Sequence, residues 1–123
     1  MRFGRVALVE DDEGLRRAIE RLLTASGHEV ATFESAEALL ASGDFAEVAC
    51  LILDVRLPGL SGFELRERLD ALDCHPPVIY VTAFDDPATH RRAEREGAPC
   101  FLKPVPGSVL LGAVRAALGE VPK

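Results

Sequence analysis

The apolar stretch from Ala49 to Leu53 constrains the fold more than any other part of the sequence, because it is uninterrupted and ends abruptly at Asp54. A strand with one solvated face alternates apolar and polar residues, whereas a central parallel strand is covered on both faces and is apolar throughout. Further strands are expected at residues 5–9, 29–33, 78–81 and 100–102. The sequence therefore predicts a sheet whose middle is buried on both sides.

Amphipathic stretches separate these expected strands, and their boundary residues indicate helices. The first stretch repeats leucine and isoleucine at helical spacing between residues 15 and 23. The boundary signals are Gly27 after the first helix, Ser35 before the second, the Ser61 and Glu64 capping box before the third, and Asp86–Pro87 and Gly97 around the fourth. A last, unusually apolar helix is expected at residues 109–118.

Strands that alternate with helices in this way predict an α/β fold. With 123 residues, 48% of them hydrophobic, we expect residues 1–123 to form a single domain. The expected architecture is flavodoxin-like: a doubly wound, five-stranded parallel sheet in the order 2-1-3-4-5, with right-handed crossovers that place helices on both faces. In such sheets, ligands bind beyond the carboxyl ends of the strands.

The residues that follow those carboxyl ends form one candidate site. Glu10 and Asp11 follow the first strand, Asp54 the third, Thr82 the fourth and Lys103 the fifth. Because neighbouring strands lie about 4.8 Å apart, the three carboxylates are expected to share one crevice with the hydroxyl and the ammonium on its far side. Asp12 lies one place further along and is expected at the surface, at the start of the first helix.

Carboxylates this close repel one another, so the crevice needs a compensating cation. Ligands that are all oxygen favour Mg²⁺, and a carboxylate can also act as a nucleophile and form an aspartyl phosphate. Phosphoryl transfer depends mainly on positioning and electrostatics, which this set of residues supplies. The net charge of −6 and the pI near 5.0 argue against nucleic acid as a direct partner.

The ordered set of motifs resembles the receiver domains of bacterial two-component response regulators, the CheY-like family. Each motif alone is weak, but the set spans almost the whole chain at nearly the expected intervals. The matching segments are Val9–Asp12, Asp54–Gly59 with Ser61–Gly62, Val81–Ala83, Gly97–Ala98 and Lys103–Pro104.

The resemblance implies a role for each matching residue. Asp54 would accept the phosphoryl group, Asp11 would bind Mg²⁺ directly, and Glu10 would bind it directly or through water. The backbone carbonyl of Arg56 would be a further metal ligand. Thr82 would bind a phosphoryl oxygen and move on activation.

Lys103 would pair with the phosphate through its ammonium group, and its peptide bond to Pro104 would be cis. The donor would be a histidine kinase, a phosphotransfer protein or a small phosphodonor. The chain would be a cytoplasmic signalling module that catalyses only its own phosphorylation and dephosphorylation, with no membrane contact.

Less specific interpretations exist for each motif. Residues 11–13 alone could be an acidic first turn of a helix, Asp54 a loop start, Thr82 an ordinary strand residue and Lys103–Pro104 an exposed turn. Two rival functions are a phosphatase that works through an aspartyl phosphate and a metal-binding scaffold that is never phosphorylated. No output domain follows Leu118, so either a stand-alone receiver or the front of a longer regulator is expected.

The cysteines and histidines are expected outside the chemistry. Three cysteines without a CxxC spacing indicate reduced thiols that are mostly packed, and the three histidines are expected at the surface. The residues are Cys50, Cys74 and Cys100, and His28, His75 and His90.

Two further expectations concern the end of the chain. In the last helix Val109, Gly112 and Ala116 should face outward, as a surface for a second copy, an output partner or the kinase. Receivers usually carry an aromatic residue three places before the lysine, where this chain has Cys100 and places Phe101 one residue later. We expect Cys100 to take the switch position and Phe101 to point into the opposite layer, because a one-residue shift reverses side-chain direction.

Overall fold

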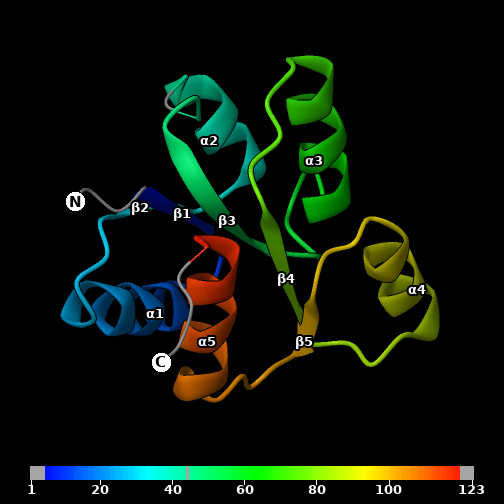
Figure 1. The fold of residues 1–123 in the computed structure, drawn as a ribbon. Helices are drawn as coiled ribbons and strands as arrows, with labels where there is room; N and C mark the ends of the chain where they lie inside the picture. Colours follow the sequence, from blue (N-terminus) through cyan, green and yellow to red (C-terminus); the bar gives the residue numbers. More distant parts are fainter. Residues whose placement is uncertain (1–4, 44, 120–123) are drawn as a thin grey trace.

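The computed structural model describes residues 5–43 and 45–119 and contains a five-stranded parallel sheet in the order β2-β1-β3-β4-β5 (Figure 1). This order confirms the predicted doubly wound, flavodoxin-like fold. Strand bounds agree with the sequence prediction to within one residue. The strands are β1 (Arg5–Val9), β2 (Val30–Phe33), β3 (Val48–Asp54), β4 (Val78–Thr82) and β5 (Cys100–Leu102).

Five helices connect and follow the strands. They are α1 (Glu13–Ala25), α2 (Ala36–Ser42), α3 (Gly62–Ala71), α4 (Pro87–Arg95) and α5 (Gly107–Ala117). The caps at Ser35, Ser61 with Glu64, and Asp86 are present as predicted. Helix α5 begins two residues earlier than predicted, because its first turn has no side-chain cap to mark the start. None of the described helices is long and apolar enough to cross a membrane.

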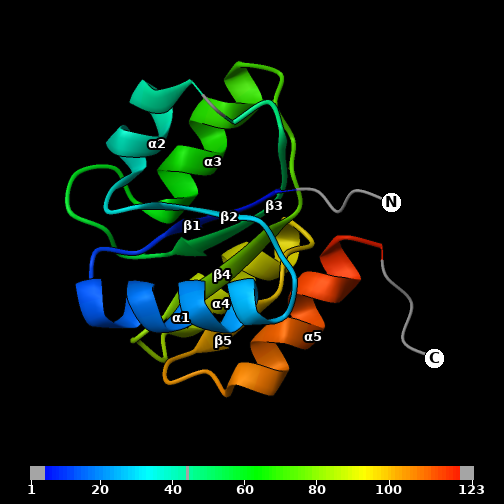
Figure 2. The same cartoon turned by 90° about the vertical axis from the view of Figure 1, so that its left-hand side faces the viewer.

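The helices form two layers, one on each face of the sheet. Helices α1 and α5 lie on one face, and α2 and α3 lie on the other (Figures 1 and 2). Helix α4 flanks β5 and contributes Ala93 to the core on the α2 and α3 side. Each face therefore has its own hydrophobic cluster.

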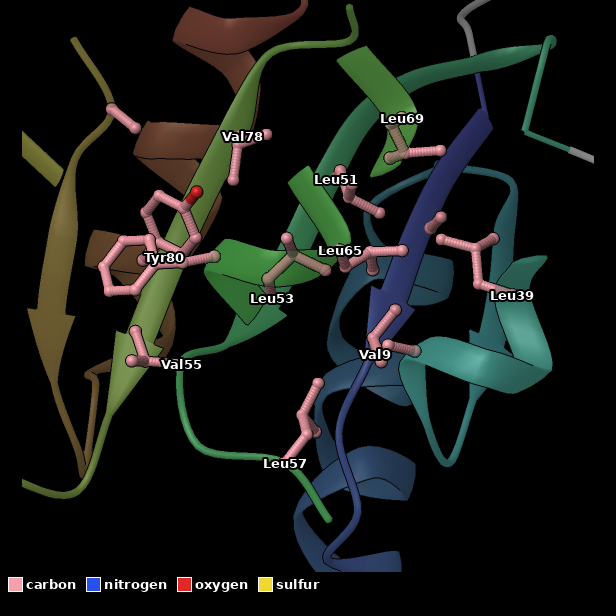
Figure 3. Packing of buried hydrophobic residues seen from close by; sticks show 14 of the residues in the cluster. Val9, Leu39, Leu51, Leu53, Val55, Leu57, Leu65, Leu69, Val78 and Tyr80 are labelled. Atoms are coloured by element: carbon pink, nitrogen blue, oxygen red, sulfur yellow. The ribbon is translucent and has the colours of Figure 1, made fainter. Parts of the chain in front are cut away.

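The central strand β3 divides its side chains between these clusters. Leu51 and Leu53 pack among the residues of α2 and α3 (Figure 3), whereas Cys50 and Ile52 pack against α1 and α5. All four side chains are fully buried. Burial on both faces is what the uninterrupted apolar run predicts, and only the first two residues of the strand, Val48 and Ala49, are partly accessible to water.

The expectation that His28 lies at the surface was wrong. His28 is only 6% exposed, because α1 ends in a Schellman motif. Gly27 has a positive φ of 89°, and the backbone N–H of His28 donates to the carbonyl of Leu23. This motif directs the residue after the glycine back against the helix. His75 is exposed and His90 partly exposed, and the three cysteines are free, with Cys50 buried and the other two partly buried.

Candidate functional site

The predicted site residues gather at one edge of the sheet. Asp54 is the last residue of β3 and Thr82 the last of β4, while Glu10 follows β1 and Lys103 follows β5. The parallel register aligns these ends, since Val9 pairs with Leu53 in one ladder and Asp54 with Val81 in the next. The topology alone therefore brings together residues far apart in the sequence.

Lys103 is the centre of the pocket. Its Nζ donates to Oε1 of Glu10 at 2.6 Å and to Oδ2 of Asp54 at 2.7 Å. The Glu10 side chain is 1% exposed, that of Asp54 7% and that of Lys103 18%. Asp11 is exposed at the rim, and its carboxylate lies with those of Glu10 and Asp54 in a group whose ligand atoms are all within 4.8 Å of one another.

The pocket holds more carboxyl groups than positive charges, and burial shifts the pKa values of Glu10 and Lys103. Burial raises the pKa of Glu10 to about 7, although hydrogen bonds from Lys103 and from the Asp12 backbone oppose the rise. Burial lowers the pKa of Lys103, but its bonds to Asp54 and Glu10 outweigh this and leave the pKa raised. One ammonium thus faces three carboxyl groups, and a hard divalent cation such as Mg²⁺ suits the donor set.

Backbone contacts that the sequence analysis did not identify hold the carboxylates in place. The Arg56 N–H donates to Oδ1 of Asp54 at 3.1 Å, and the Arg16 guanidinium donates to the Glu10 carbonyl at 2.9 Å. The Asp12 N–H donates to Oε2 of Glu10 at 3.1 Å. Asp12 lies at the start of α1 as expected, and its side chain also caps this helix. These bonds leave little freedom to the two buried acids.

Gly62 allows α3 to begin directly against the Asp54 backbone. A Cβ atom at this position would stand 2.5 Å from the Asp54 carbonyl oxygen, closer than any side chain tolerates. The Gly62 N–H donates to the Val55 carbonyl at 3.0 Å. The Ser61–Gly62 motif was noticed in the sequence, but only the three-dimensional contact reveals why the glycine is needed.

Thr82 is buried at the edge of the pocket, and its hydroxyl is engaged by the β4–α4 loop. The Phe84 N–H donates to the Thr82 Oγ1 at 3.1 Å. The Phe84 ring is half exposed, and the Arg56 guanidinium carbon lies 4.0 Å from its centroid. The hydroxyl thus bonds to the loop before α4.

At the β5 end, Cys100 and Phe101 pack in opposite layers, as predicted. The Lys103 N–H donates to the Thr82 carbonyl at 2.7 Å, and the Lys103–Pro104 peptide bond is cis, as expected. Cys100 packs against the cluster of α2 and α3, and Phe101 against the cluster of α1 and α5. Lys103 keeps its place at the pocket, so Cys100 occupies the position three residues before it.

Comparison with known proteins identifies the class of protein that this fold and site define. Residues 6–115 match the family model of the response regulator receiver domain. The chain therefore belongs to the response regulator receiver domain family, whose general function is to accept a phosphoryl group in two-component signalling.

Particular relatives are similar over nearly the whole chain. Nodulation protein W of Bradyrhizobium diazoefficiens is 43% identical over 91% of this chain and 50% of its own length. The transcriptional regulatory protein FixJ of Azorhizobium caulinodans is 38% identical over 94% of this chain and 55% of its own. The crystal structure of FixJ-N superposes with a TM-score of 0.84 at 32% identity, covering 100% of this chain and 99% of that one. The chain thus spans about half the length of the curated relatives it matches.

Proposed function

We propose that this chain accepts a phosphoryl group on Asp54 from a phosphohistidine of a histidine kinase or phosphotransfer protein, and thereby switches the binding of a partner. The observation that carries the proposal is the Lys103 ammonium between Glu10 and Asp54, 2.6 and 2.7 Å from their oxygens. This arrangement presents one carboxylate as a nucleophile beside a cation that can pair with the incoming phosphate.

In the proposed reaction, an Asp54 carboxylate oxygen attacks phosphorus and forms a new P–O bond. The P–N bond to the donor histidine breaks, and the imidazole nitrogen keeps the electron pair and takes up a proton. Lys103 and the Thr82 hydroxyl hold phosphoryl oxygens. In dephosphorylation, water attacks the same phosphorus, the bond between phosphorus and the Asp54 oxygen breaks, and inorganic phosphate leaves while Asp54 regains its carboxylate. The chain thus catalyses only its own phosphorylation and dephosphorylation.

Glu10, Asp11 and Asp54 would hold Mg²⁺, together with the backbone carbonyl of Arg56. The metal supplies positive charge that lets phosphoryl oxygens approach carboxylates. The ligand atoms of Glu10, Asp11 and Asp54 lie within 4.8 Å of one another, which supports this assignment because a bound cation would offset the repulsion among the three carboxylates.

We further propose that residues 1–123 act as a single receiver domain and that α5 presents a surface for a second copy or an output partner. Val109, Gly112 and Ala116 are exposed on this helix. Val109 and Ala116 also line a groove that includes Phe101 and Pro99 of the β5 segment. Glu substitutions at Val109 and Ala116 should weaken dimerisation or kinase docking. If both kinds of association were unchanged in these variants, this face of α5 would not be an interaction surface.

A second groove supports docking of the phosphodonor. It lies between α1 and the β5–α5 segment, is lined mainly by apolar side chains such as Leu15, Leu22 and Val105, and reaches Lys103. A protein that carries phosphohistidine must bring its imidazole to this end of the sheet, and apolar surface beside the pocket offers area to bury.

The test is incorporation of acid-labile phosphate from a small acyl phosphate. We expect labelling of the wild type that requires Mg²⁺, no labelling of Asp54→Asn, and almost none of Asp11→Ala. Labelling that persists in Asp54→Asn or ignores a chelator would refute the proposal. Steady multiple turnover of a generic phosphomonoester would favour a phosphatase, and a wild type that binds Mg²⁺ but takes no phosphate would favour a scaffold.

A further inference from the structure

Helix α4 has fewer buried residues than any other described helix. Of its nine residues only Ala93 is buried, whereas α3 buries Phe63, Leu65 and Leu69 along with its first glycine. Little apolar surface therefore holds α4 in place, and its polar contacts determine its position to an unusual degree.

One of these polar contacts begins inside the sheet. Tyr80 of β4 is fully buried, and its hydroxyl donates to Oε1 of Glu96 at 2.6 Å, at the C-cap of α4. Glu96 also pairs with Nη1 of Arg66 in α3 at 3.5 Å and with Nε of Arg92 in α4 at 3.7 Å. We call these four residues the Tyr80–Glu96 cluster.

Aromatic and ionic contacts extend the cluster between α3 and α4. The Phe63 and Tyr80 rings lie 4.6 Å apart between centroids, and the Arg92 guanidinium carbon lies 4.5 Å from the Phe63 centroid. Arg92 also bonds to Glu67 of α3. Burial and the neighbouring Glu96 carboxylate raise the pKa of Tyr80, so its phenol stays protonated and remains a donor. A hydrogen bond from a buried group to a carboxylate is stronger than one between neutral groups.

The two ends of α4 are thus connected to β4 at residues that share one face of the sheet. Before the helix, the Phe84 N–H bonds to the Thr82 hydroxyl, and after it Glu96 bonds to Tyr80, two residues earlier in the strand. Cys100, not an aromatic residue, is the β5 neighbour of Tyr80 in the ladder. Tyr80 is therefore the aromatic residue through which this face of the sheet contacts α4.

We propose that Tyr80 is a positioning residue, which through Glu96 holds α4 in its unphosphorylated place and sets how readily phosphorylation moves it. The inference rests on the proposed function. When the Thr82 hydroxyl turns to a phosphoryl oxygen, Phe84 loses its acceptor and the N-terminal end of α4 is released. The Tyr80–Glu96 cluster then provides the remaining resistance to movement of the helix.

The experiment is hydrogen exchange of the backbone amides, with and without beryllofluoride and Mg²⁺ as a phosphoryl mimic. In unmodified Tyr80→Phe, which keeps the ring and removes the donor, α4 amides should exchange about tenfold faster than in the wild type, the effect of losing one charge-assisted hydrogen bond. Adding the mimic should accelerate α4 in the wild type by releasing Phe84. It should accelerate α4 more in Tyr80→Phe, where the cluster no longer resists movement of the helix.

Two variants separate the cluster from general effects. Glu96→Gln keeps an acceptor for the phenol but loses the ion pairs, so it should show a smaller acceleration in α4. Glu94→Gln removes the same charge from an exposed position on this helix and should match the wild type.

The outcomes are distinguishable. Equal acceleration of α1, α4 and α5 in Tyr80→Phe would mark a loss of overall stability and overturn the inference. So would a Tyr80→Phe variant whose α4 exchanges no faster than that of the wild type, or responds to the mimic less than that of the wild type does. A wild type whose Asp54 takes neither the mimic nor a phosphoryl group would contradict the proposed function itself, and the role of Tyr80 would fail with it.

Discussion

Replacing Lys103 by methionine should destabilise the metal-free protein by about 3 kcal/mol at roughly pH 8, because two charge-assisted hydrogen bonds of about 1.5 kcal/mol each are lost. Both bonds end on carboxylates that are nearly inaccessible to water, 1% and 7% exposed. Removing the ammonium leaves the buried carboxylates of Glu10 and Asp54 without a positive partner, and breaking a buried ion pair from one side in this way is strongly destabilising. Methionine preserves most of the side-chain volume, so packing contributes little to the change.

The destabilisation caused by Lys103→Met should decrease as the pH falls and as Mg²⁺ is added. Burial already raises the pKa of Glu10 to about 7, and removing the lysine raises it further, so protonation relieves the repulsion with Asp54 as the pH falls. The cost of Lys103→Met should therefore shrink below about pH 7 and also shrink when Mg²⁺ is added.

Urea unfolding of the wild type and the variant, at two pH values and with Mg²⁺ or a chelator, measures this cost. Arg91→Met is the matched control, because it removes one positive charge from an exposed position on α4. A Lys103→Met cost that equals the control, or that grows as the pH falls, would refute the electrostatic account of the pocket.

Three further predictions test the surrounding structure. Phe101→Ala should lower the free energy of unfolding in urea by about 2 kcal/mol, less than for a fully buried phenylalanine, because Phe101 is only partly buried. Phosphorylation-dependent partner binding should survive in this variant. A stable variant that binds its partner regardless of phosphorylation would show that Phe101 is the switch residue. Gly62→Ala should destabilise the protein by about 1–3 kcal/mol and slow the labelling of Asp54 with phosphate, since the new Cβ meets the Asp54 carbonyl. Gly112→Ala should be neutral or stabilising, because a Cβ at this position of α5 meets open space. Equal effects of the two substitutions would contradict the close contact at Gly62. Hydrogen bonds to Asp70 and Asp73 raise the pKa of His75. The difference in stability between the wild type and His75→Ala should therefore be largest below about pH 6.5 and disappear as the pH rises through the folded-state pKa. A difference that grows with pH would be evidence against these ion pairs.

The fold and the pocket were predictable because both depend on patterns that a sequence displays directly. Uninterrupted apolar runs identify central strands, and the polar residue that ends each run must lie at the same edge of a parallel sheet. The sequence alone thus indicates that Glu10, Asp54 and Lys103 lie together. The position of Cys100 and Phe101 on opposite layers followed from the same periodicity.

Contacts between distant backbone atoms were not predictable in this way. The burial of His28 depends on the hydrogen bond between its own N–H and Leu23, which a polar side chain gives no reason to expect. The need for Gly62 arises from the approach of α3 to the Asp54 carbonyl. The bond between Tyr80 and Glu96 joins a strand to the far end of a helix, and neither residue has a sequence pattern that marks it.

The central claim is that Asp54, rather than another acid of the pocket, receives the phosphoryl group. Borohydride reduction converts an aspartyl phosphate to homoserine, which peptide mass spectrometry locates by residue. After treatment with a small acyl phosphate and Mg²⁺, we predict homoserine at position 54 and none in samples that contain a chelator. Homoserine at position 11, or phosphate retained on a peptide that lacks Asp54, would contradict the account.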